Sequence, residues 1–598
     1  MKDVLTDIEI KPYRVALVIG DQWDDPAGFL VNVPSTLPED QYSDSFVSSD
    51  FSSLIIMFKS WGITFDIIRL DQEFMDINRF IGPDGKPAVG CIIWDADHRS
   101  KLQPQRYEVL REAVNDYGIS LIALADRIRE PVIQELLGIK HIGDLLSIDG
   151  LEHSGVHFIT KGMKSPFDYM DEPATAGKSV EVELNGAESI VKQGKYPQVA
   201  IRRLESGAGA VWIGGDIERM FSCQEIRTLF RRAITWCIGY SFFKTWENKG
   251  WMMLDDPGGA QNPWLDHWHY PTLTEEQIDK HLIKPLKEHN AILVINVIPG
   301  FVNDELRRVE PSFKRKFTDE FGTFQDYPST LRGLIKGMKA GVFEISSHGL
   351  THMQPDLWSQ PGPWYGAALD KERAEVGWYR EFGDVRRGKE IPAGEALWRM
   401  KTGIKWLEYL FGITPLSFSQ GGEGPSISIS YPNHTYCLTA LAGFGWYTWS
   451  GGYLGRDLAV RGWDFRGTMD CPLFAAAPPD AHDKGIAEHP EQFLRVFEEN
   501  PNVEWMGLRE YIAYIHADVS GGGDKGFALQ VDYDSHYCRH FEKNNSEWNL
   551  LAADWLAKAL GKVTISVDGK ATVADADLNE QLKIKIPAGL GTHNIQIE

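Results

Sequence analysis

Gly250-Trp-Met-Met-Leu-Asp-Asp-Pro-Gly-Gly259 is a short apolar run that stops at two acids and a turn. The run is typical of a buried strand, so Asp255 and Asp256 follow its carboxyl end. In α/β folds and barrels, ligands bind at that end of the strands. An Asp-Asp pair is unremarkable by itself in a chain with 84 acidic residues. The pair therefore needs a second motif before it predicts a site.

A second apolar run, Val342-Phe-Glu-Ile345, also ends at polar groups, in Ser346-Ser-His-Gly-Leu-Thr-His352. His348 and His352 stand four apart, so one helical turn would place both imidazoles on one face. A metal ion with two nitrogen ligands requires that arrangement. With 17 histidines in the chain, this spacing arises by chance about 0.5 times. The order and strand-end placement of both motifs, rather than either one alone, indicate a metal site.

Together the two motifs resemble those of the polysaccharide deacetylase (NodB-homology) family. The family's first motif is a strand ending in T-F-D-D-G, and its second is H-S/T-x-x-H. This chain has Met253-Leu-Asp-Asp-Pro-Gly-Gly259 and His348-Gly-Leu-Thr-His352 in those places. The match departs at Gly349, where the family has Ser or Thr. The resemblance implies a hydrolase that removes N- or O-acetyl groups from a saccharide.

By this resemblance Asp255 is the general base, and the metal ligands are Asp256, His348 and His352. An Asp/His/His set suits a divalent ion, with Zn²⁺ favoured, and leaves positions open for water and substrate oxygen. The ion would acidify its water and polarise the acetyl carbonyl. Asp255 would take the proton of the attacking water.

The family's last motif supplies a histidine that protonates the leaving amine. Ala481-His-Asp-Lys-Gly-Ile486 fits this motif best, so His482 is the preferred acid and His489 is its rival. The neighbouring Asp483 would help to keep His482 charged. The alternative is a loop histidine without a role in the chemistry.

Two features depart from the family. Asp256 and His348 are further apart in sequence than in compact members, which fits an inserted substrate loop, for example at 303–327. The family's Arg-x-Pro motif, whose Arg orients the base, aligns with 414–424, where no Arg stands. The missing Arg favours a non-catalytic, carbohydrate-binding member of the fold. A metal-independent glycoside hydrolase using paired acids such as Asp255 and Glu423 is a third hypothesis.

Aromatic residues are frequent, at 12% of the chain, and flat aromatic faces suit pyranose rings. Most tryptophans in proteins serve packing, so we expect only one or two of the candidates to line a saccharide groove. The candidates are Trp264, Trp268, Trp358, Trp364 and Trp449. His267 and His269 could contact substrate or simply cap a loop.

The predicted fold class is a multidomain α/β protein, because 598 residues exceed what one core supports. Residues 246–525 are expected to form a distorted (β/α) barrel, with a capping box at Thr274-Glu-Glu-Gln277 opening a helix that runs toward Asn290. Residues 526–598 alternate like strands, with a hairpin signal at Asp568-Gly569, and predict a small antiparallel β-sandwich-like domain.

Residues 1–245 alternate buried strands with helices, which predicts an α/β domain with a mostly parallel sheet. This segment weakly resembles glutamine-amidotransferase-like accessory domains. No Cys and no Gly-rich elbow follow the strand at 121–124, so we expect a non-catalytic domain. Asp95, Asp97 and His98 form either a site or, as we prefer, a polar loop after a strand.

The bulk properties bear on partners and surroundings. A net charge of −23 argues against nucleic acid or an anionic membrane as the main partner. Six scattered cysteines without a CxxC pair make a Cys-rich zinc site unexpected. No signal-peptide-like or spanning apolar run is visible, so the chain reads as cytoplasmic, or as secreted if an export signal was removed. A carbohydrate is the expected partner, and an oligomer stays open.

Overall fold

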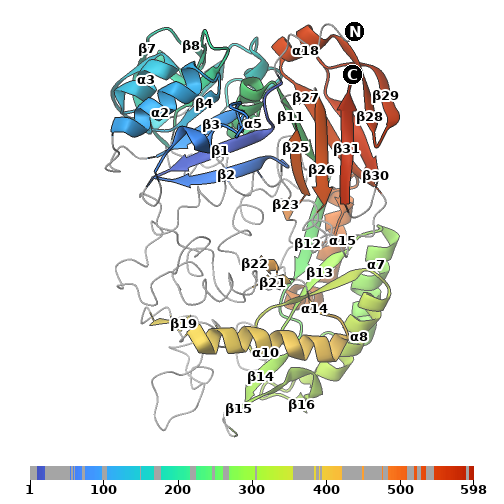
Figure 1. Ribbon diagram of the computed structural model, residues 1–598. Helices are drawn as coiled ribbons and strands as arrows, with labels where there is room; N and C mark the ends of the chain where they lie inside the picture. The colour runs from blue at the N-terminus through green and yellow to red at the C-terminus, as the bar shows by residue number, and fades with distance from the viewer. Residues whose placement is uncertain are drawn as a thin grey trace.

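The computed structural model describes residues 10–20, 54, 58, 61–70, 74–96, 104–148, 150–167, 177–215, 224–244, 249–259, 269–303, 306, 308–353, 381, 383–384, 389–390, 393–415, 417–419, 447–449, 474–475, 482–507, 517–521, 527–533, 545–587 and 591–598. They form a mixed sheet with helices, a parallel sheet with helices, and a pair of antiparallel sheets (Figure 1).

The N-terminal sheet has eight strands in the order β2-β1-β3-β4-β10-β9-β8-β6. In chain order these are β1 (Arg14–Ile19), β2 (Thr64–Arg69), β3 (Cys91–Asp95), β4 (Ser120–Leu124), β6 (Glu152–His153), β8 (Glu188–Gln193), β9 (Tyr196–Arg203) and β10 (Gly209–Ile213). The first five strands in the sheet are parallel, and the last three continue antiparallel. The expected parallel sheet is therefore mixed, because short hairpins rather than helical crossovers join β8, β9 and β10.

Helices cover both faces of this sheet. One face packs on α2 (Pro104–Asn115) and α3 (Pro131–Leu137), and the other packs on α5 (Gln224–Ile238). Successive side chains of a strand point to opposite faces, so Leu17 and Val18 of β1 belong to different apolar clusters. Both clusters consist of buried apolar side chains, which makes this a two-sided α/β layer structure.

The central sheet runs in the order β22-β21-β18-β13-β12-β23, with β24 also pairing with β12. All its pairings are parallel. In chain order its strands are β12 (Lys249–Leu254), β13 (Leu293–Val297), β18 (Phe343–Ser347), β21 (Ser417–Ser419), β22 (Tyr447–Trp449), β23 (Phe474–Ala475) and β24 (Glu504–Trp505). Parallel strands bring their carboxyl ends to one edge, and both sequence motifs follow strands at that edge.

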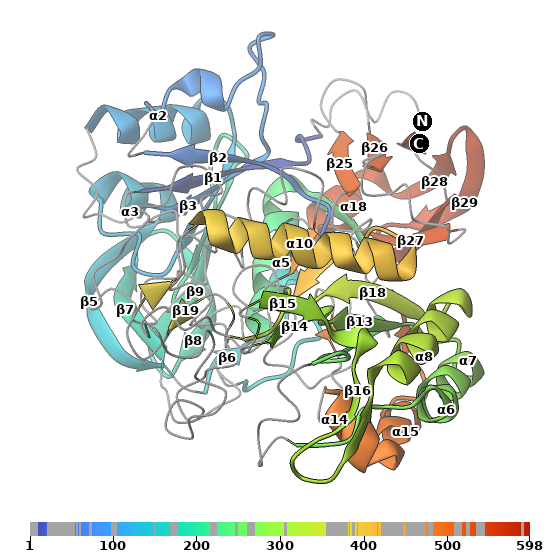
Figure 2. The same ribbon diagram turned by 90° about the horizontal axis from the view of Figure 1, so that it is seen from below.

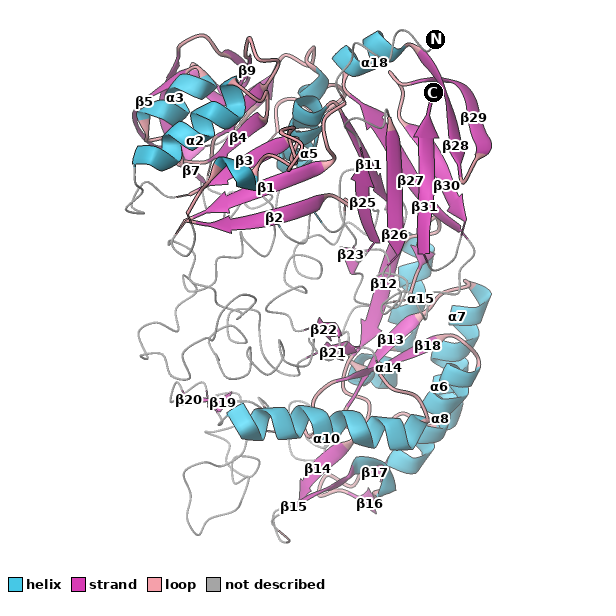
Figure 3. Ribbon diagram, in the orientation of Figure 1, coloured by secondary structure: helices cyan, strands magenta, loops and turns pink. Residues whose placement is uncertain are grey.

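Helices gather along one side of β12, β13 and β18, as Figure 3 shows. They are α6 (Glu275–Ile278), the π-helical turn η6 (Asp279–Ile283), α7 (Lys284–Glu288), α8 (Tyr327–Lys339), α14 (Asp483–Glu488) and α15 (Pro490–Glu499). The longer α10 (Ala393–Phe411) runs alongside β18, as the view in Figure 2 shows. Leu407 and Phe411 of α10 join the same apolar cluster as Phe343 and Ile345 of β18.

Four two-stranded ribbons complete the α/β parts: β5 (Ile139–Ile148) with β7 (Gly177–Leu184), β14 (Gly300–Asn303) with β15 (Arg308–Pro311), β16 (Lys316–Thr318) with β17 (Phe324–Asp326), and β19 (Gly383–Asp384) with β20 (Lys389–Glu390). The ribbons β14–β15 and β16–β17 occupy the segment expected to be an inserted loop.

The C-terminal strands form two antiparallel sheets, in the orders β11-β27-β30 and β25-β26-β31-β28-β29. Their members are β11 (Tyr240–Lys244), β25 (Ala517–Gly521), β26 (Ala528–Tyr533), β27 (Asn545–Ala552), β28 (Lys562–Val567), β29 (Lys570–Asp577), β30 (Leu582–Pro587) and β31 (Gly591–Ile597), with helix α18 (Asp554–Leu560) after β27. β11 and β25 come from outside residues 526–598, and one apolar cluster joins these sheets to the N-terminal sheet. The domain boundaries at 245 and 525 stay predictions.

Two further expectations concern the shape of the central sheet and the membrane. Within the described part of the chain, no pairing connects β22 with β23 or β24, so a closed barrel also stays a prediction. The described helices are all too short or too polar to cross a membrane.

Candidate metal centre

The first half of the centre is the turn after β12. Asp256 has a φ of 76°, and Gly258 has a φ of 91°. A Cβ on Gly258 would lie 2.3 Å from the carbonyl oxygen of Ile298, so only glycine fits there. The amide of Ile298 also donates to the carbonyl of Pro257 at 3.0 Å. The Pro-Gly-Gly sequence thus anchors the two acids against the end of β13.

The second half is the segment after β18, and here the sequence interpretation needs a correction. His348 and His352 do not lie on a helical turn, because 348–353 form bends and irregular backbone. Gly349 has a φ of 94° and His352 a φ of 56°, both in the left-handed region. The amides of 350–352 donate to the buried carboxylate of Glu381 instead of to carbonyls one turn back.

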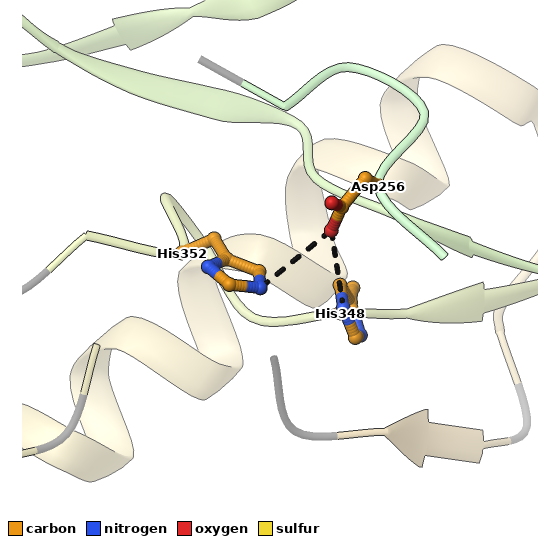
Figure 4. A group of neighbouring side chains, drawn as sticks. All are labelled: Asp256, His348 and His352. Atoms are coloured by element: carbon orange, nitrogen blue, oxygen red, sulfur yellow. Dashed lines mark ion pairs between the residues drawn. The ribbon is translucent and has the colours of Figure 1, made fainter. Parts of the chain in front are cut away.

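The turn nevertheless brings the three expected ligands together, as Figure 4 shows. Oδ1 of Asp256 lies 3.5 Å from Nε2 of His348 and 3.6 Å from Nε2 of His352. The three side chains are almost fully buried. Two ligands on a tetrahedral Zn²⁺ at its usual bond lengths would be about 3.4 Å apart. The separations therefore fit an ion held by all three residues.

The state of the ligand atoms also fits a cation. Oδ1 of Asp256 is buried, and no described residue reaches it with a normal hydrogen bond, as expected of an oxygen that faces an ion site. Burial opposes ionisation of Asp256, yet the contact with His348 holds the pKa of its carboxyl well below the ordinary value. Burial lowers the pKa of His352. An anionic carboxylate and a neutral imidazole are the forms that bind metal.

Asp255, the expected base, precedes Asp256 at the end of β12, and its carboxylate is held by Asn296. Leu254 is paired with Ile295, so Asp255 and Asn296 follow as neighbours on the same face of the sheet. Nδ2 of Asn296 donates to Oδ1 of Asp255 at 2.6 Å. Asn296 is 1% exposed. Sequence reasoning missed this residue, although a lone polar side chain in the apolar run 291–297 was a signal for it.

The two candidate acids lie in different surroundings. His482 forms a parallel bridge with Asp255, and the amide of Asp483 donates to the carbonyl of Asp255 at 3.0 Å. A charge on His482 contributes to the lowered pKa of Asp256. His489 is an exposed residue at the end of α14, with Nδ1 3.8 Å from a Glu491 carboxylate oxygen. The structure therefore brings His482, and not His489, to the acids.

Asp483 is buried beside the centre and accepts a hydrogen bond from the hydroxyl of Tyr270. Burial and the negative charge of Asp256 raise the pKa of Asp483 well above its ordinary value. These two effects favour the neutral form of Asp483, and its help in keeping His482 charged stays a prediction. No sequence pattern pointed to Tyr270.

The structure describes only some of the other candidates from the sequence. Nε2 of His269 is 2.7 Å from a carboxylate oxygen of Asp319, so this ring is tied to the β16–β17 ribbon. Asp95 is buried and pairs with Nε of Arg127 at 3.3 Å. Trp449 lies in β22. Outside the described residues lie Asp97, His98, Trp264, His267, Trp268, Trp358, Trp364 and Glu423.

Comparison with known proteins gives structural similarities only. No protein-family model and no curated protein matches the sequence. A crystal structure of Agd3, described as a novel carbohydrate deacetylase, is similar over 96% of this chain and 99% of that chain, at 10% identity and a TM-score of 0.37. A ThuA-like protein from Parabacteroides merdae matches 38% of this chain and 90% of its own, at 11% identity and a TM-score of 0.26.

The Xyl-CE4 domain of a multidomain xylanase from the hindgut metagenome of Trinervitermes trinervoides is also similar. The match covers 44% of this chain and 90% of that domain, at 11% identity and a TM-score of 0.21. At such values the function of this chain has to be inferred from its own residues.

Proposed function

We propose that this chain is a metal-dependent carbohydrate deacetylase, with its active centre at the carboxyl ends of β12 and β18. The observation that carries the proposal is the buried cluster of Asp256, His348 and His352, with ligand atoms within 4.8 Å of one another. A second carboxylate belongs to Asp255, the residue directly before Asp256 in the chain. A metal site with an adjacent base is the arrangement needed for hydrolysis of an amide or ester.

Asp256, His348 and His352 would hold a divalent ion, for which Zn²⁺ is the best fit to one carboxylate and two imidazoles. Such an ion supplies Lewis-acid polarisation of a carbonyl and a more acidic water. The burial of the three side chains excludes bulk solvent from the ligand atoms. Their interactions with one another are therefore weakly screened.

Asp255 would take the proton from the attacking water, and His482 would deliver a proton to the leaving nitrogen or oxygen. Asn296 would orient the Asp255 carboxylate through its amide, a role that an Arg has in the family whose motifs this chain resembles. The backbone bridge between Asp255 and His482 keeps base and acid on neighbouring segments. The acetylated saccharide as substrate follows from the motif resemblance, and the similar deacetylase structures agree with it.

The experiment combines metal analysis with acetate release from oligomers of N-acetylglucosamine and N-acetylgalactosamine. We expect one equivalent of a transition metal in the wild type and in Asp255→Asn, and loss of that metal in Asp256→Ala. Acetate release is expected only from the wild type, and a chelator should abolish it. A protein that takes up no metal under any loading condition contradicts the proposal.

A non-catalytic carbohydrate-binding protein of the same fold is the second candidate, because no Arg stands in the segment 414–424. That function predicts metal uptake and oligosaccharide binding without acetate release from any substrate. The third hypothesis, a glycoside hydrolase, predicts new reducing ends that form without metal and disappear in Asp255→Asn and Glu423→Gln.

A further inference from the structure

The segment that carries both histidine ligands wraps around a buried carboxylate from a distant part of the chain. Oε2 of Glu381 accepts hydrogen bonds from the amides of Leu350 at 3.0 Å, Thr351 at 3.2 Å and His352 at 3.1 Å. Glu381 is 1% exposed. Three consecutive amides converging on one oxygen form an anion-binding nest. One of these amides belongs to a ligand residue itself.

The charge of Glu381 is balanced within the protein. Nη1 of Arg399 lies 3.4 Å from Oε1 of Glu381, and both side chains are 1% exposed. Arg399 belongs to α10, so the ion pair connects the histidine segment with that helix. Burying a charged carboxylate without a partner of opposite charge is costly, and Arg399 reduces that cost.

Gly349 is the position that makes room for this carboxylate. A Cβ there would lie 2.3 Å from Oε2 of Glu381. The related family has Ser or Thr at this place in its motif, so the departure at Gly349 and the presence of Glu381 belong to one arrangement. The glycine also permits the φ of 94° that turns the following amides toward Glu381.

The same segment is enclosed on two further sides. A Cβ on Gly403 of α10 would lie 2.7 Å from the carbonyl oxygen of Gly349, and the amide of Gly300 donates to the carbonyl of Leu350 at 2.9 Å. Arg399 and Gly403 stand four apart and so lie on one face of α10. Helix α10 and strand β14 thus contact the carbonyl groups of the histidine segment, and Glu381 binds its amides.

We propose that Glu381 is a positioning residue of the metal centre: its carboxylate holds 350–352 in the turn that presents His352 to Asp256 and His348. The inference rests on the metal site of the proposed function and adds a residue that none of its motifs contains. Residues of this kind, which orient a ligand without touching the metal, change metal affinity strongly in other proteins.

The test uses Co²⁺ and Zn²⁺ titrations of the full chain, with the visible absorption of bound Co²⁺ as a measure of ligand geometry. In Glu381→Gln, one carboxylate oxygen becomes an NH2 group that cannot accept a hydrogen bond, so the single remaining oxygen can serve either the three amides or Arg399 but not both. We expect the metal Kd to rise about 10- to 100-fold, with an altered Co²⁺ spectrum. Glu381→Asp, which keeps the charge but not the reach, should recover part of the affinity.

Asp319→Asn is the matched control. Asp319 is a buried carboxylate that also accepts two backbone amides, those of Phe321 and Thr323, at 3.0 and 2.9 Å. It serves the β16–β17 ribbon and not the histidine segment. Asp319→Asn should therefore lower stability while it leaves the metal Kd and the Co²⁺ spectrum unchanged.

A double-mutant cycle between Gly349→Ala and Glu381→Ala separates the steric clash with Glu381 from a general loss of structure. With Glu381 present, the added Cβ meets Oε2, and we expect a large loss of affinity. In the Glu381→Ala background, the same change should cost less, because the clash is gone and only the backbone strain remains. Equal losses in the two backgrounds would contradict a coupled pair.

The single Glu381 variants leave the charge of Arg399 buried without the carboxylate of Glu381, which destabilises the fold. The double variant Glu381→Gln/Arg399→Met removes both buried charges and tests the same inference without this problem. This protein should fold and still bind metal weakly. If the wild type binds metal and the folded Glu381 variants bind it equally well with the same Co²⁺ spectrum, the inference is wrong. If the wild type binds no metal, the proposed function fails first.

Discussion

The hydrogen bond between Asn296 and Asp255 has a different electrostatic character from the Arg–Asp pair of the polysaccharide deacetylase family, whose motifs this chain resembles. An amide fixes the orientation of the carboxylate at 2.6 Å without adding a positive charge. Asn296 has few ways to move, because it is buried in a strand between two other strands. Orientation by a rigid neutral donor is therefore what Asn296 contributes to the centre.

Replacing Asn296 by Ala removes the donor and leaves the carboxylate of Asp255 free to rotate. We expect kcat for acetate release to fall about 100-fold, since a misplaced reacting group has effects of that size. The metal Kd should not change, because Asn296 is not among the three ligands. Steady-state kinetics and Zn²⁺ titration of the same protein measure the two quantities.

Asn549→Ala is a suitable control for this variant. Asn549 is likewise 1% exposed and accepts a hydrogen bond from Gln581 at 2.7 Å, but in the C-terminal sheets. It should lower thermal stability without changing kcat. A normal kcat in Asn296→Ala would mean that another group orients Asp255.

The choice between the two candidate acids leads to a second prediction. His482→Ala should lower kcat about 100-fold or more, as loss of a general acid does, and should leave metal content intact. His489→Ala should behave like the wild type, because this ring is exposed beside Glu491. The opposite pattern in acetate-release assays would reassign the acid to His489.

The ligands Asp256, His348 and His352 could be predicted because each follows an apolar run in a recognisable pattern. Glu381 could not be predicted, because it stands 29 residues after His352 and acts through backbone amides that any sequence has. Tyr270 could not be predicted either, because its hydrogen-bond partner Asp483 is 213 residues away in the sequence. Local patterns therefore identified the residues of the proposed metal site better than the residues that hold them in place.

Secondary structure with strong local signals was predicted correctly. The capping box at Thr274 and Gln277 is present, and Asp568 and Gly569 form the expected hairpin turn, both with positive φ. The helix opened by the capping box contains the π-helical turn η6, which was not predicted. Pro285 follows that turn and has no amide to donate, which fits a local departure from α-helical bonding.

A glycine lets helix α8 pack closely on the central sheet. A Cβ on Gly337 of α8 would lie 2.1 Å from the ring of Phe343 in β18. Gly337→Ala would therefore push α8 away from the strand that leads to His348. We expect a net loss of about 1–2 kcal/mol, because overpacking outweighs the better helix propensity of Ala. In calorimetry, one unfolding transition should shift to higher temperature when metal is added. Gly337→Ala should lower the midpoint temperature of that same transition.

Gly394→Ala gives the comparison for that change. Gly394 is exposed in the first turn of α10, and a Cβ there would meet no atom within 4 Å. The substitution should be neutral or stabilising by up to about 1 kcal/mol. Equal effects of the two substitutions would show that α8 tolerates a wider separation from β18.

Pairings between distant segments were the least predictable part of the fold. The alternating pattern after residue 526 predicted an antiparallel β domain, and antiparallel sheets are present. No local signal indicates that β11 and β25 join these sheets, because the residue pattern of a strand does not determine which strand it pairs with. The N-terminal and C-terminal parts of the chain consequently share one core.

A shared core predicts that damage in the C-terminal sheets destabilises the N-terminal sheet. Trp548 of β27 is fully buried, stacks on Phe242 of β11 with ring centroids 5.0 Å apart, and would meet a Cβ on Gly62 at 2.9 Å. Trp548→Ala should cost about 3–5 kcal/mol. Hydrogen exchange of β1 and β3 should then accelerate, while amides of β13 in the central sheet should exchange as in the wild type.

The exposed Trp398 of α10 supplies the control, because it is 51% accessible and its removal should change stability by less than about 0.5 kcal/mol. Residues 1–244 would unfold with the C-terminal sheets in one calorimetric transition, and metal would shift only the transition of the central part. Unchanged exchange in β1 and β3 of Trp548→Ala would show that the two parts unfold independently despite their common apolar cluster.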